Sequence, residues 1–221
     1  MFKKTVSQLV VGPIATNCWI YPLGEKKAAI IDPGDQAGKI ISRLEQLSLV
    51  PRYILLTHGH FDHIAALPQL AQAFAAIKPQ IAIHRLDSHY LGAEAYSSQI
   101  ISAKAAMGDT SFIDDDWREM PPADILLDEG AVIGPFTVLH VPGHTEGSAA
   151  FWDKDEGLLF SGDTLFRGAY GRTDLPGGSE AAIIASLNRL FTMEAGTVVY
   201  PGHGGTTTIG RESKAAAQMY A

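Results

Sequence analysis

The chain contains little cysteine and no long apolar stretch: Cys18 is the single cysteine among 221 residues. One cysteine cannot form an internal disulfide, which is typical of proteins from a reducing compartment, so we expect a cytoplasmic protein. Cys18 lies in a strand-like stretch and is interpreted as a small buried apolar residue rather than a reactive thiol. No stretch is long and apolar enough to span a membrane, and the N-terminus lacks the apolar region and cleavage site of a leader peptide. A membrane partner is therefore not expected.

Positive charge is also scarce. The 17 lysines and arginines are outnumbered by 24 acidic residues, which gives a net charge of -7. The basic residues form no stripe of the kind that follows a nucleic-acid backbone, so nucleic acid is not an expected partner either. A hydrophobic fraction of 46% and a charged fraction of 19% are typical of a folded globular protein.

Short apolar runs alternate with helical patterns through the first half of the chain, which is typical of α/β folds. These patterns predict strands at 27–31, 52–57 and 80–84 and helices at 37–47 and 64–74. The second half carries hairpin signals at 131–141 and 149–160, a helical pattern at 180–190 and a strand pattern at 197–200. Because no flexible linker separates these similar layered halves, residues 1–221 are predicted to form one domain.

Residues 85–124 follow a different pattern, which is mostly helical and polar and ends at two prolines. Two interpretations are open. The segment is either a helical insertion between two sheets that hangs over a functional site, or a helical cover for a sheet.

The densest chemistry of the chain lies in six residues, His58-Gly-His60-Phe-Asp62-His63. Crowding three imidazoles and a carboxylate together is costly in a packed domain unless a cation satisfies their lone pairs. The run follows a predicted strand and precedes a predicted helix, so it would lie where α/β proteins build their sites. Gly59 is expected to allow a tight turn between the first two histidines. The run therefore predicts a divalent metal site.

Three more polar residues end strand-like runs in glycine-containing turns: His144 in Pro-Gly-His-Thr, Asp163 in Ser-Gly-Asp-Thr and His203 in Pro-Gly-His-Gly. With the first cluster they make five histidines and two aspartates. Seven ligands are too many for one tetrahedral ion and suit two ions that share a carboxylate. Imidazole and carboxylate without thiolate are compatible with zinc, iron or manganese.

The order HxHxDH, PGHT, SGD and PGH, spread over residues 58–203, resembles the metallo-β-lactamase superfamily. The resemblance implies an αββα sandwich, in which two mixed β-sheets pack face to face with helices on their outer faces. It implies a first metal held by His58, His60 and His144, a second held by Asp62, His63 and His203, and Asp163 as the bridge. The expected metals are two zinc ions, with iron or manganese as alternatives. Asp62 and Asp163 would position a metal-bound hydroxide, and Asp32 would support the metal loop.

Within the superfamily the chain resembles the glyoxalase II-like group, whose members cleave thioesters. The resemblance rests on Thr16-Asn-Cys18, Gly162-Asp-Thr-Leu-Phe166, Gly171-Arg-Thr-Asp174 and the tail at 202–212, which is most like that of short single-domain members. It implies a metal-dependent hydrolase acting on a small-molecule thioester such as the glutathione conjugate S-lactoylglutathione.

Three residues are candidates for substrate contact. Arg172 lies where glyoxalase II places a lysine that contacts glutathione, and the alternative role is an ion pair with Asp174. Phe166 and Tyr170 either line the substrate pocket or pack in the core.

Other functions stay open. The segment 167–174 also resembles persulfide dioxygenases of the superfamily, in which one iron held by two histidines and an aspartate activates oxygen. A β-lactam hydrolase would share the fold and the metals, and a non-enzymatic metal-binding module would share the fold. Metal content and oxygen consumption would separate the thioester hydrolase from the dioxygenase. His84, His89 and His140 fall outside the metal pattern and are interpreted as structural.

Overall fold

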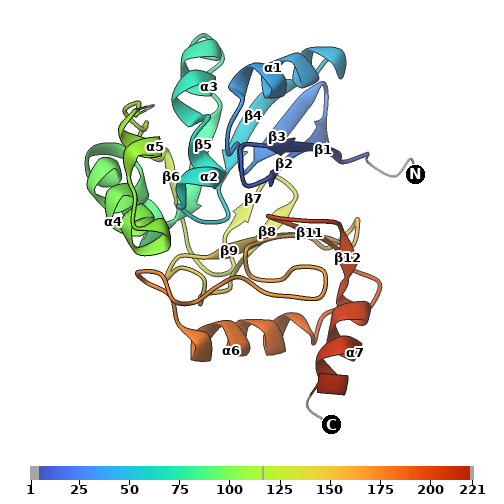
Figure 1. Cartoon of the computed structure of the whole chain (residues 1–221). Coiled ribbons are helices and arrows are strands. Elements are labelled where there is room, and N and C mark those ends of the chain that lie inside the picture. Colours follow the sequence, from blue (N-terminus) through green and yellow to red (C-terminus); the bar gives the residue numbers. More distant parts are fainter. Residues whose placement is uncertain (1–4, 116, 220–221) are drawn as a thin grey trace.

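The computed structural model describes residues 5–115 and 117–219, so residues 1–4, 116 and 220–221 of the predicted domain lie outside it. Two six-stranded sheets form the centre of the fold (Figure 1). The first contains, in spatial order, β1 (Ser7–Val11), β2 (Thr16–Gly24), β3 (Lys27–Ile31), β4 (Val50–Leu55), β5 (Gln80–His84) and β6 (Ile125–Leu127). The second contains β12 (Thr207–Thr208), β11 (Val198–Pro201), β10 (Leu158–Gly162), β9 (Ala149–Asp153), β8 (Phe136–His140) and β7 (Val132–Ile133).

Both sheets are mixed. In the first sheet β1, β2 and β3 are antiparallel neighbours, whereas β3 to β6 run parallel. In the second sheet β10 and β11 pair in parallel and the other neighbouring strands are antiparallel. Parallel neighbours need long crossover connections, which here contain helices. The helices are α1 (Ala37–Gln46), α2 (Phe61–Ile64), α3 (Leu67–Ala73), the 3₁₀ helices η1 (Arg85–Tyr90) and η2 (Gly92–Glu94), α4 (Ala95–Met107), α5 (Ser111–Asp114), α6 (Glu180–Leu190) and α7 (Ile209–Met219).

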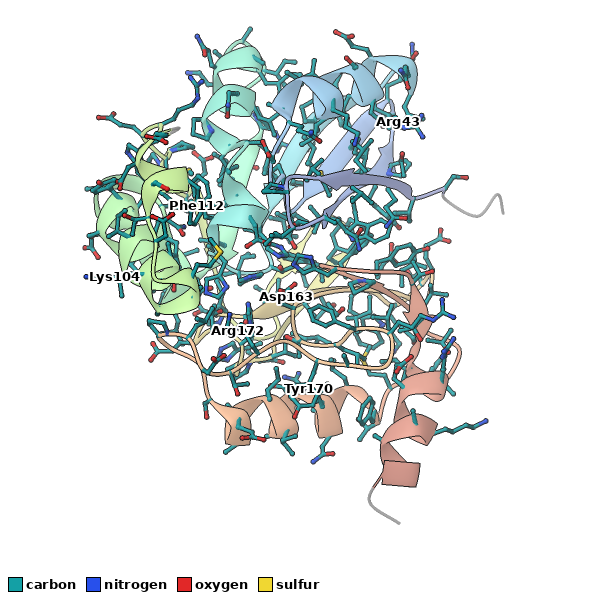
Figure 2. All side chains as sticks on the ribbon, viewed as in Figure 1. Arg43, Lys104, Phe112, Asp163, Tyr170 and Arg172 are labelled. Atoms are coloured by element: carbon teal, nitrogen blue, oxygen red, sulfur yellow. The ribbon has the colours of Figure 1, made fainter. Side chains whose placement is uncertain are left out.

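Buried apolar side chains form three clusters where the layers pack against one another. Figure 2 shows side chains filling the space between the layers. Between the sheets, Tyr21 of the first sheet meets Phe136 and Phe160 of the second, with ring centroids 5.0 and 5.8 Å apart. On the outer face of the second sheet, Ile183 and Leu187 of α6 pack in a separate cluster.

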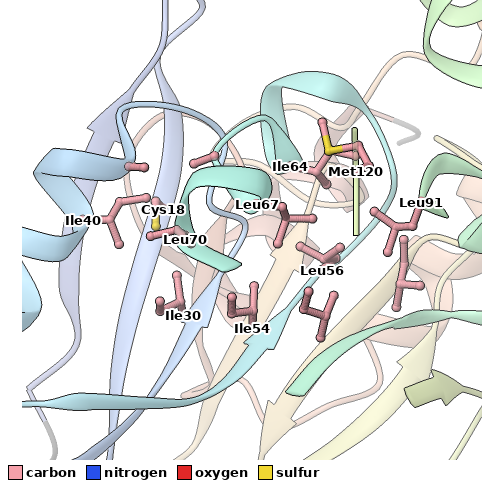
Figure 3. Packing of buried hydrophobic residues seen from close by; sticks show 14 of the residues in the cluster. Cys18, Ile30, Ile40, Ile54, Leu56, Ile64, Leu67, Leu70, Leu91 and Met120 are labelled. Carbon is pink, nitrogen blue, oxygen red and sulfur yellow. The ribbon is translucent and has the colours of Figure 1, made fainter. Parts of the chain in front are cut away.

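The cluster on the outer face of the first sheet brings α1 and α3 against β3 and β4 (Figure 3). Ile40 of α1 and Leu67 of α3 lie in the same buried cluster as Ile30 and Ile54. Cys18 is fully buried there, as predicted. The layers follow the order helix, sheet, sheet, helix, so the predicted αββα sandwich with two mixed sheets is confirmed.

Two predicted elements differ from the structure by more than a shift of one or two residues, such as that of the strand predicted at 52–57, which is Val50–Leu55. The structure has two helices where one was expected at 64–74: α2 begins at Phe61 and ends at Ile64, and α3 begins at Leu67. Pro68 lies in the first turn of α3, where its missing N–H is tolerated, whereas a continuous helix would need that N–H. The early start of α2 places Asp62 and His63 on a helix.

The segment 85–124, for which two interpretations were open, is helical only as far as Asp114. It joins β5 to β6, which are parallel neighbours of the first sheet. With three residues, β6 is too short to give a periodic sequence pattern, so it was not predicted. Among the described residues, no helix has the length and apolar character needed to cross a membrane.

Candidate metal centre

Loops that follow the carboxyl ends of strands bring the seven predicted ligands together. His58 and His60 follow β4, and α2 adds Asp62 and His63. His144 lies between β8 and β9, Asp163 follows β10 directly and His203 follows β11. Figure 2 shows Asp163 near the middle of the molecule, where the two sheets meet.

His58, His60 and His144 form the first group. All three are buried, and one ring nitrogen of each lies within 4.8 Å of the others. His60 Nδ1 and His144 Nε2 are 2.8 Å apart, and the ring of His58 lies 4.9 and 4.8 Å from those two rings. A neutral imidazole offers one N–H and one lone pair, so three facing rings leave lone pairs for a cation.

Asp62, His63 and His203 form the second group, whose ligand atoms also lie within 4.8 Å of one another. His63 Nε2 is 3.2 Å from Asp62 Oδ2 and 3.4 Å from His203 Nε2. Two nitrogens bound to one tetrahedral zinc ion at about 2.05 Å would lie about 3.3 Å apart. The spacing of the second group therefore suits one ion.

Asp163 lies between the two groups. Its Oδ1 is 3.3 Å from His63 Nε2, and its Oδ2 is 3.5 Å from His203 Nε2 and 3.7 Å from His144 Nε2. One carboxylate thus contacts members of both groups, as a ligand shared by two ions would.

Buried polar atoms without partners fit a cation at this place. Among the described residues, four buried side-chain polar atoms have no hydrogen-bond partner. Three belong to predicted ligands: His58 Nε2, Asp163 Oδ1 and His60 Nε2, although His60 turns its other nitrogen, Nδ1, toward His144. Such atoms are costly unless something satisfies them. The nitrogen and oxygen donors fit a pair of divalent ions and are compatible with zinc, iron or manganese.

Asp32, which follows β3, orients the second group. Its Oδ2 accepts hydrogen bonds from His63 Nδ1 at 3.0 Å and Thr57 Oγ1 at 2.7 Å, and its Oδ1 accepts from Thr57 N at 2.8 Å. In a neutral ring, a proton on His63 Nδ1 leaves the lone pair on Nε2, which faces the other ligands. His144 Nδ1 donates in the same way to the backbone oxygen of Arg172 at 2.7 Å.

The electrostatics of the two groups differ. Burial and the neighbouring imidazoles lower the pKa of His58 well below its usual range, and burial lowers the pKa of His60 to about 3. Burial also opposes the charged form of His63 and His203, but nearby carboxylates raise the pKa of His63 well above its usual range and that of His203 to about 9. His58 and His60 are therefore neutral, whereas His63 and His203 must release protons when a cation binds.

The three predicted substrate residues lie on the loop after Asp163. Phe166 is half-buried with its ring 5.9 Å from that of His203. Tyr170 is 42% exposed, so the alternative of core packing is wrong for this side chain. Arg172 is exposed and makes two hydrogen bonds of 2.7 Å with Asp174, the ion pair that was its alternative role. Its contact with substrate stays a prediction.

Sequence reasoning missed three buried side chains that hold the loops of this site: Asp87, Gln99 and Glu212. Asp87 and Gln99 bond to the loop at Gly59, and Glu212 Oε2 accepts from Gly168 N at 2.8 Å in the loop that carries Tyr170. Glu212 belongs to the tail motif, which was its only signal. Asp87 and Gln99 gave none, because their contacts are distant in sequence.

Known proteins are similar to this chain over most of its length. Residues 11–203 match the family described as the metallo-beta-lactamase superfamily. The chain is 35% identical over 205 residues to the hydroxyacylglutathione hydrolase GloC of Haemophilus influenzae, covering 90% of each protein. The crystal structure of the BLEG-1 B3 metallo-beta-lactamase has a TM-score of 0.80 and 36% identity, covering 95% of this chain and 97% of that one. The crystal structure of TTHA1623 in a di-iron-bound form has the same TM-score and identity, covering 95% and 98%.

Proposed function

The chain belongs to the metallo-beta-lactamase superfamily, and from this premise we propose a metal-dependent hydrolase that cleaves a small-molecule thioester such as S-lactoylglutathione. One observation carries the proposal: Asp163 contacts His144 of the first group and both histidines of the second. A site for two ions that share a carboxylate is suited to hydrolysis. The identity to a hydroxyacylglutathione hydrolase over nearly the whole length supports the thioester.

The first group would hold one ion, the second group the other, and Asp163 would bridge them. Two divalent ions in these positions would polarise the substrate carbonyl and lower the pKa of a water molecule toward neutrality. Thr16 Oγ1 donates a hydrogen bond of 2.8 Å to Asp62 Oδ2, which fixes that carboxylate in the second group. Asp62 and Asp163 would orient the attacking water and accept its hydrogen bonds.

No side-chain nucleophile is needed for this reaction. Burial raises the pKa of the Cys18 thiol, which excludes it as a nucleophile. The exposed ring of Tyr170 and the half-buried ring of Phe166 would form the apolar wall for the substrate. Arg172 would bind a substrate carboxylate in place of that of Asp174.

The hydrolase is tested by measuring kcat/KM for S-lactoylglutathione with the wild-type protein and the variants His203→Ala and Asp163→Ala. Loss of a ligand should reduce kcat/KM at least about 100-fold, because even residues that only orient a ligand are worth 10–100-fold. His140→Ala is the matched control, since this histidine lies outside both groups and stacks on His84. Full activity of the ligand variants would sink the proposal.

A β-lactam hydrolase is the second candidate, favoured by the 36% identity to a B3 metallo-beta-lactamase. A chromogenic cephalosporin is therefore assayed beside the thioester, and turnover of the cephalosporin alone would replace the proposed activity. Oxygen uptake with glutathione persulfide covers the dioxygenase alternative, for which one iron per chain would be found.

Three further properties are proposed with this function. Zinc is the proposed metal in both positions because histidines dominate the donors, and the di-iron-bound relative supports iron as the alternative. The apolar cluster shared by both sheets supports one domain over residues 1–221. The lone cysteine supports a cytoplasmic location.

A further inference from the structure

A buried carboxylate outside the predicted ligand set joins two loops of the site. Asp87 lies in η1, which follows β5, and its side chain is fully buried. Asp87 Oδ2 accepts hydrogen bonds from Gly59 N at 2.9 Å and Thr145 Oγ1 at 2.8 Å. Asp87 Oδ1 accepts from Gly147 N at 2.7 Å. One side chain therefore connects the loop after β4 with the loop after β8.

Two of the three donors are immediate neighbours of ligands of the first group. Gly59 lies between His58 and His60, and Thr145 follows His144. Two ligands of the first metal come from one sheet and the third from the other, so their spacing depends on how the two loops are held together. Asp87 makes that connection through three hydrogen bonds.

Close packing keeps the connection rigid. A Cβ atom on Gly59 would lie 2.1 Å from Cδ2 of Tyr90, and one on Gly147 would lie 2.4 Å from Oδ1 of Asp87. Gln99 of α4 donates a hydrogen bond of 2.6 Å to Gly59 O, so both backbone polar groups of Gly59 are held by the segment from η1 to α4. That segment holds the metal loop and does more than cover a sheet.

The hydrogen-bond donors require a carboxylate. An ionised aspartate accepts on both oxygens, whereas an asparagine accepts on one oxygen and presents an NH₂ group on the other side. Whichever way an asparagine amide is turned at position 87, its NH₂ group faces the N–H of Gly59 or of Gly147. A backbone N–H cannot accept a hydrogen bond, so one loop loses its attachment.

We propose that Asp87 is a positioning residue for the first metal: it fixes the loops of Gly59 and Thr145 at the spacing at which the three imidazoles converge on one ion. The inference rests on the proposed metal centre and adds a residue outside its ligand set. It assigns to Asp87 the first metal, because its hydrogen bonds go to the loops that carry His58, His60 and His144 and to none of the loops that carry Asp163 or His203.

Zinc affinity, measured one site at a time in chelator-buffered zinc, tests the inference. The His203→Ala background leaves the first group intact, and the His144→Ala background leaves the second. Asp87→Asn should weaken zinc binding about 10–100-fold in the first background, the effect of losing a residue that orients ligands. In the second background the change should stay within about threefold, as for independent sites.

Asp153→Asn is the matched control. Asp153 is also a buried carboxylate, and it accepts hydrogen bonds from the hydroxyl of Tyr21 and from Glu156 N at the end of β9 away from the metal loops. This variant should lower the Tm while zinc affinity at the first group stays within about threefold. Thr145→Val and Thr145→Ser form a second pair, since only the serine keeps the hydroxyl that bonds to Asp87. The valine variant should lose about 3- to 10-fold in affinity, the equivalent of one hydrogen bond, and the serine variant should not.

Each outcome decides the inference. Unchanged zinc affinity of the first group in Asp87→Asn would overturn the inference and leave the metal centre standing. The same conclusion would follow if Asp87→Asn weakened zinc binding equally at both groups, or if Asp153→Asn weakened it at the first group as much as Asp87→Asn does. A wild-type protein that binds no zinc, iron or manganese would overturn the metal centre and the inference together. If Asp87→Asn does not fold, equal zinc affinities of the two Thr145 variants would overturn the inference.

Discussion

Replacing Asp32 by asparagine should weaken binding of the second metal and leave binding of the first unchanged. Asp32 accepts from Thr57 N on one oxygen and from Thr57 Oγ1 and His63 Nδ1 on the other. An asparagine keeps a single acceptor oxygen, which the N–H of Thr57 requires, so its NH₂ group turns toward His63. The neutral imidazole then accepts at Nδ1 and carries its proton on Nε2, which is the atom that faces Asp62 and His203.

The size of the effect follows from that single bond. Losing a carboxylate that orients a histidine ligand typically reduces metal affinity 10–100-fold, which corresponds to about 1.4–2.8 kcal/mol. The metal-free protein loses a buried hydrogen bond to a charged group, which costs about 1.5–3 kcal/mol of the free energy of unfolding. For a chain of this length, the loss lowers the Tm by about 3–12 °C.

The assay is a zinc titration of Asp32→Asn in the His144→Ala background, with the His203→Ala background reporting on the first group. Nitrogen-15 NMR of the imidazole of His63, recorded at a pH above the raised pKa of this ring, reports which nitrogen carries the proton. Asp124→Asn is the control, because Asp124 also accepts a backbone hydrogen bond, from Ile81 N at 2.8 Å, and contacts neither group. Unchanged affinity of the second group, or an equal loss in both backgrounds, would refute the reasoning.

Three other perturbations separate the parts of the site. Gly202→Ala should abolish binding of the second metal, because its Cβ would lie 2.1 Å from Oδ1 of Asp163. Gly205→Ala should not, because the nearest atom to its Cβ lies at 3.7 Å. Equal metal content in both variants would contradict this. Arg172→Ala should raise KM about tenfold for a thioester that bears a carboxylate, because a charge-assisted hydrogen bond to the substrate is lost, whereas Asp174→Ala should not raise KM. Steady-state kinetics test this. An unchanged KM in Arg172→Ala would assign this side chain to the ion pair alone. Burial and a stacked histidine lower the pKa of His84 from 6.5 to about 4, so the folded state binds this proton more weakly than the unfolded state. The free energy of unfolding should therefore fall as pH falls from about 6.5 to about 4, and it should fall less in His84→Phe. Urea denaturation curves at both ends of that range measure the loss, and an equal loss in the two proteins would contradict this.

The strongest sequence patterns predicted their elements well. The strands Lys27–Ile31 and Gln80–His84 and the helix Glu180–Leu190 have the bounds that the sequence predicts, because their apolar spacing is regular and their ends carry turn residues. The break after α2 was missed because alanine-rich sequence continues the helical pattern through Ala65 and Ala66. Local propensity cannot show that Asp62 and His63 must turn toward ligands from the other sheet.

The site was predictable where its residues stand in short motifs at strand ends. The division of the motif at 58–63 between two groups came from the family resemblance and not from spacing, and its test is metal binding. Gly59 was predicted to serve a tight turn, but its φ is not positive, and the residue is needed because Tyr90 packs against it. Asp87 lies 28 residues from Gly59 and 60 from Gly147, so its role was visible only once the chain had folded.

The central claim, a two-metal thioester hydrolase, is tested most directly by counting zinc, iron and manganese per chain in the same preparation in which S-lactoylglutathione hydrolysis and persulfide-dependent oxygen uptake are measured. We predict two metal ions per chain and thioester turnover, with both the second ion and the turnover lost in His203→Ala. One iron per chain with oxygen uptake and no thioester turnover would contradict the account.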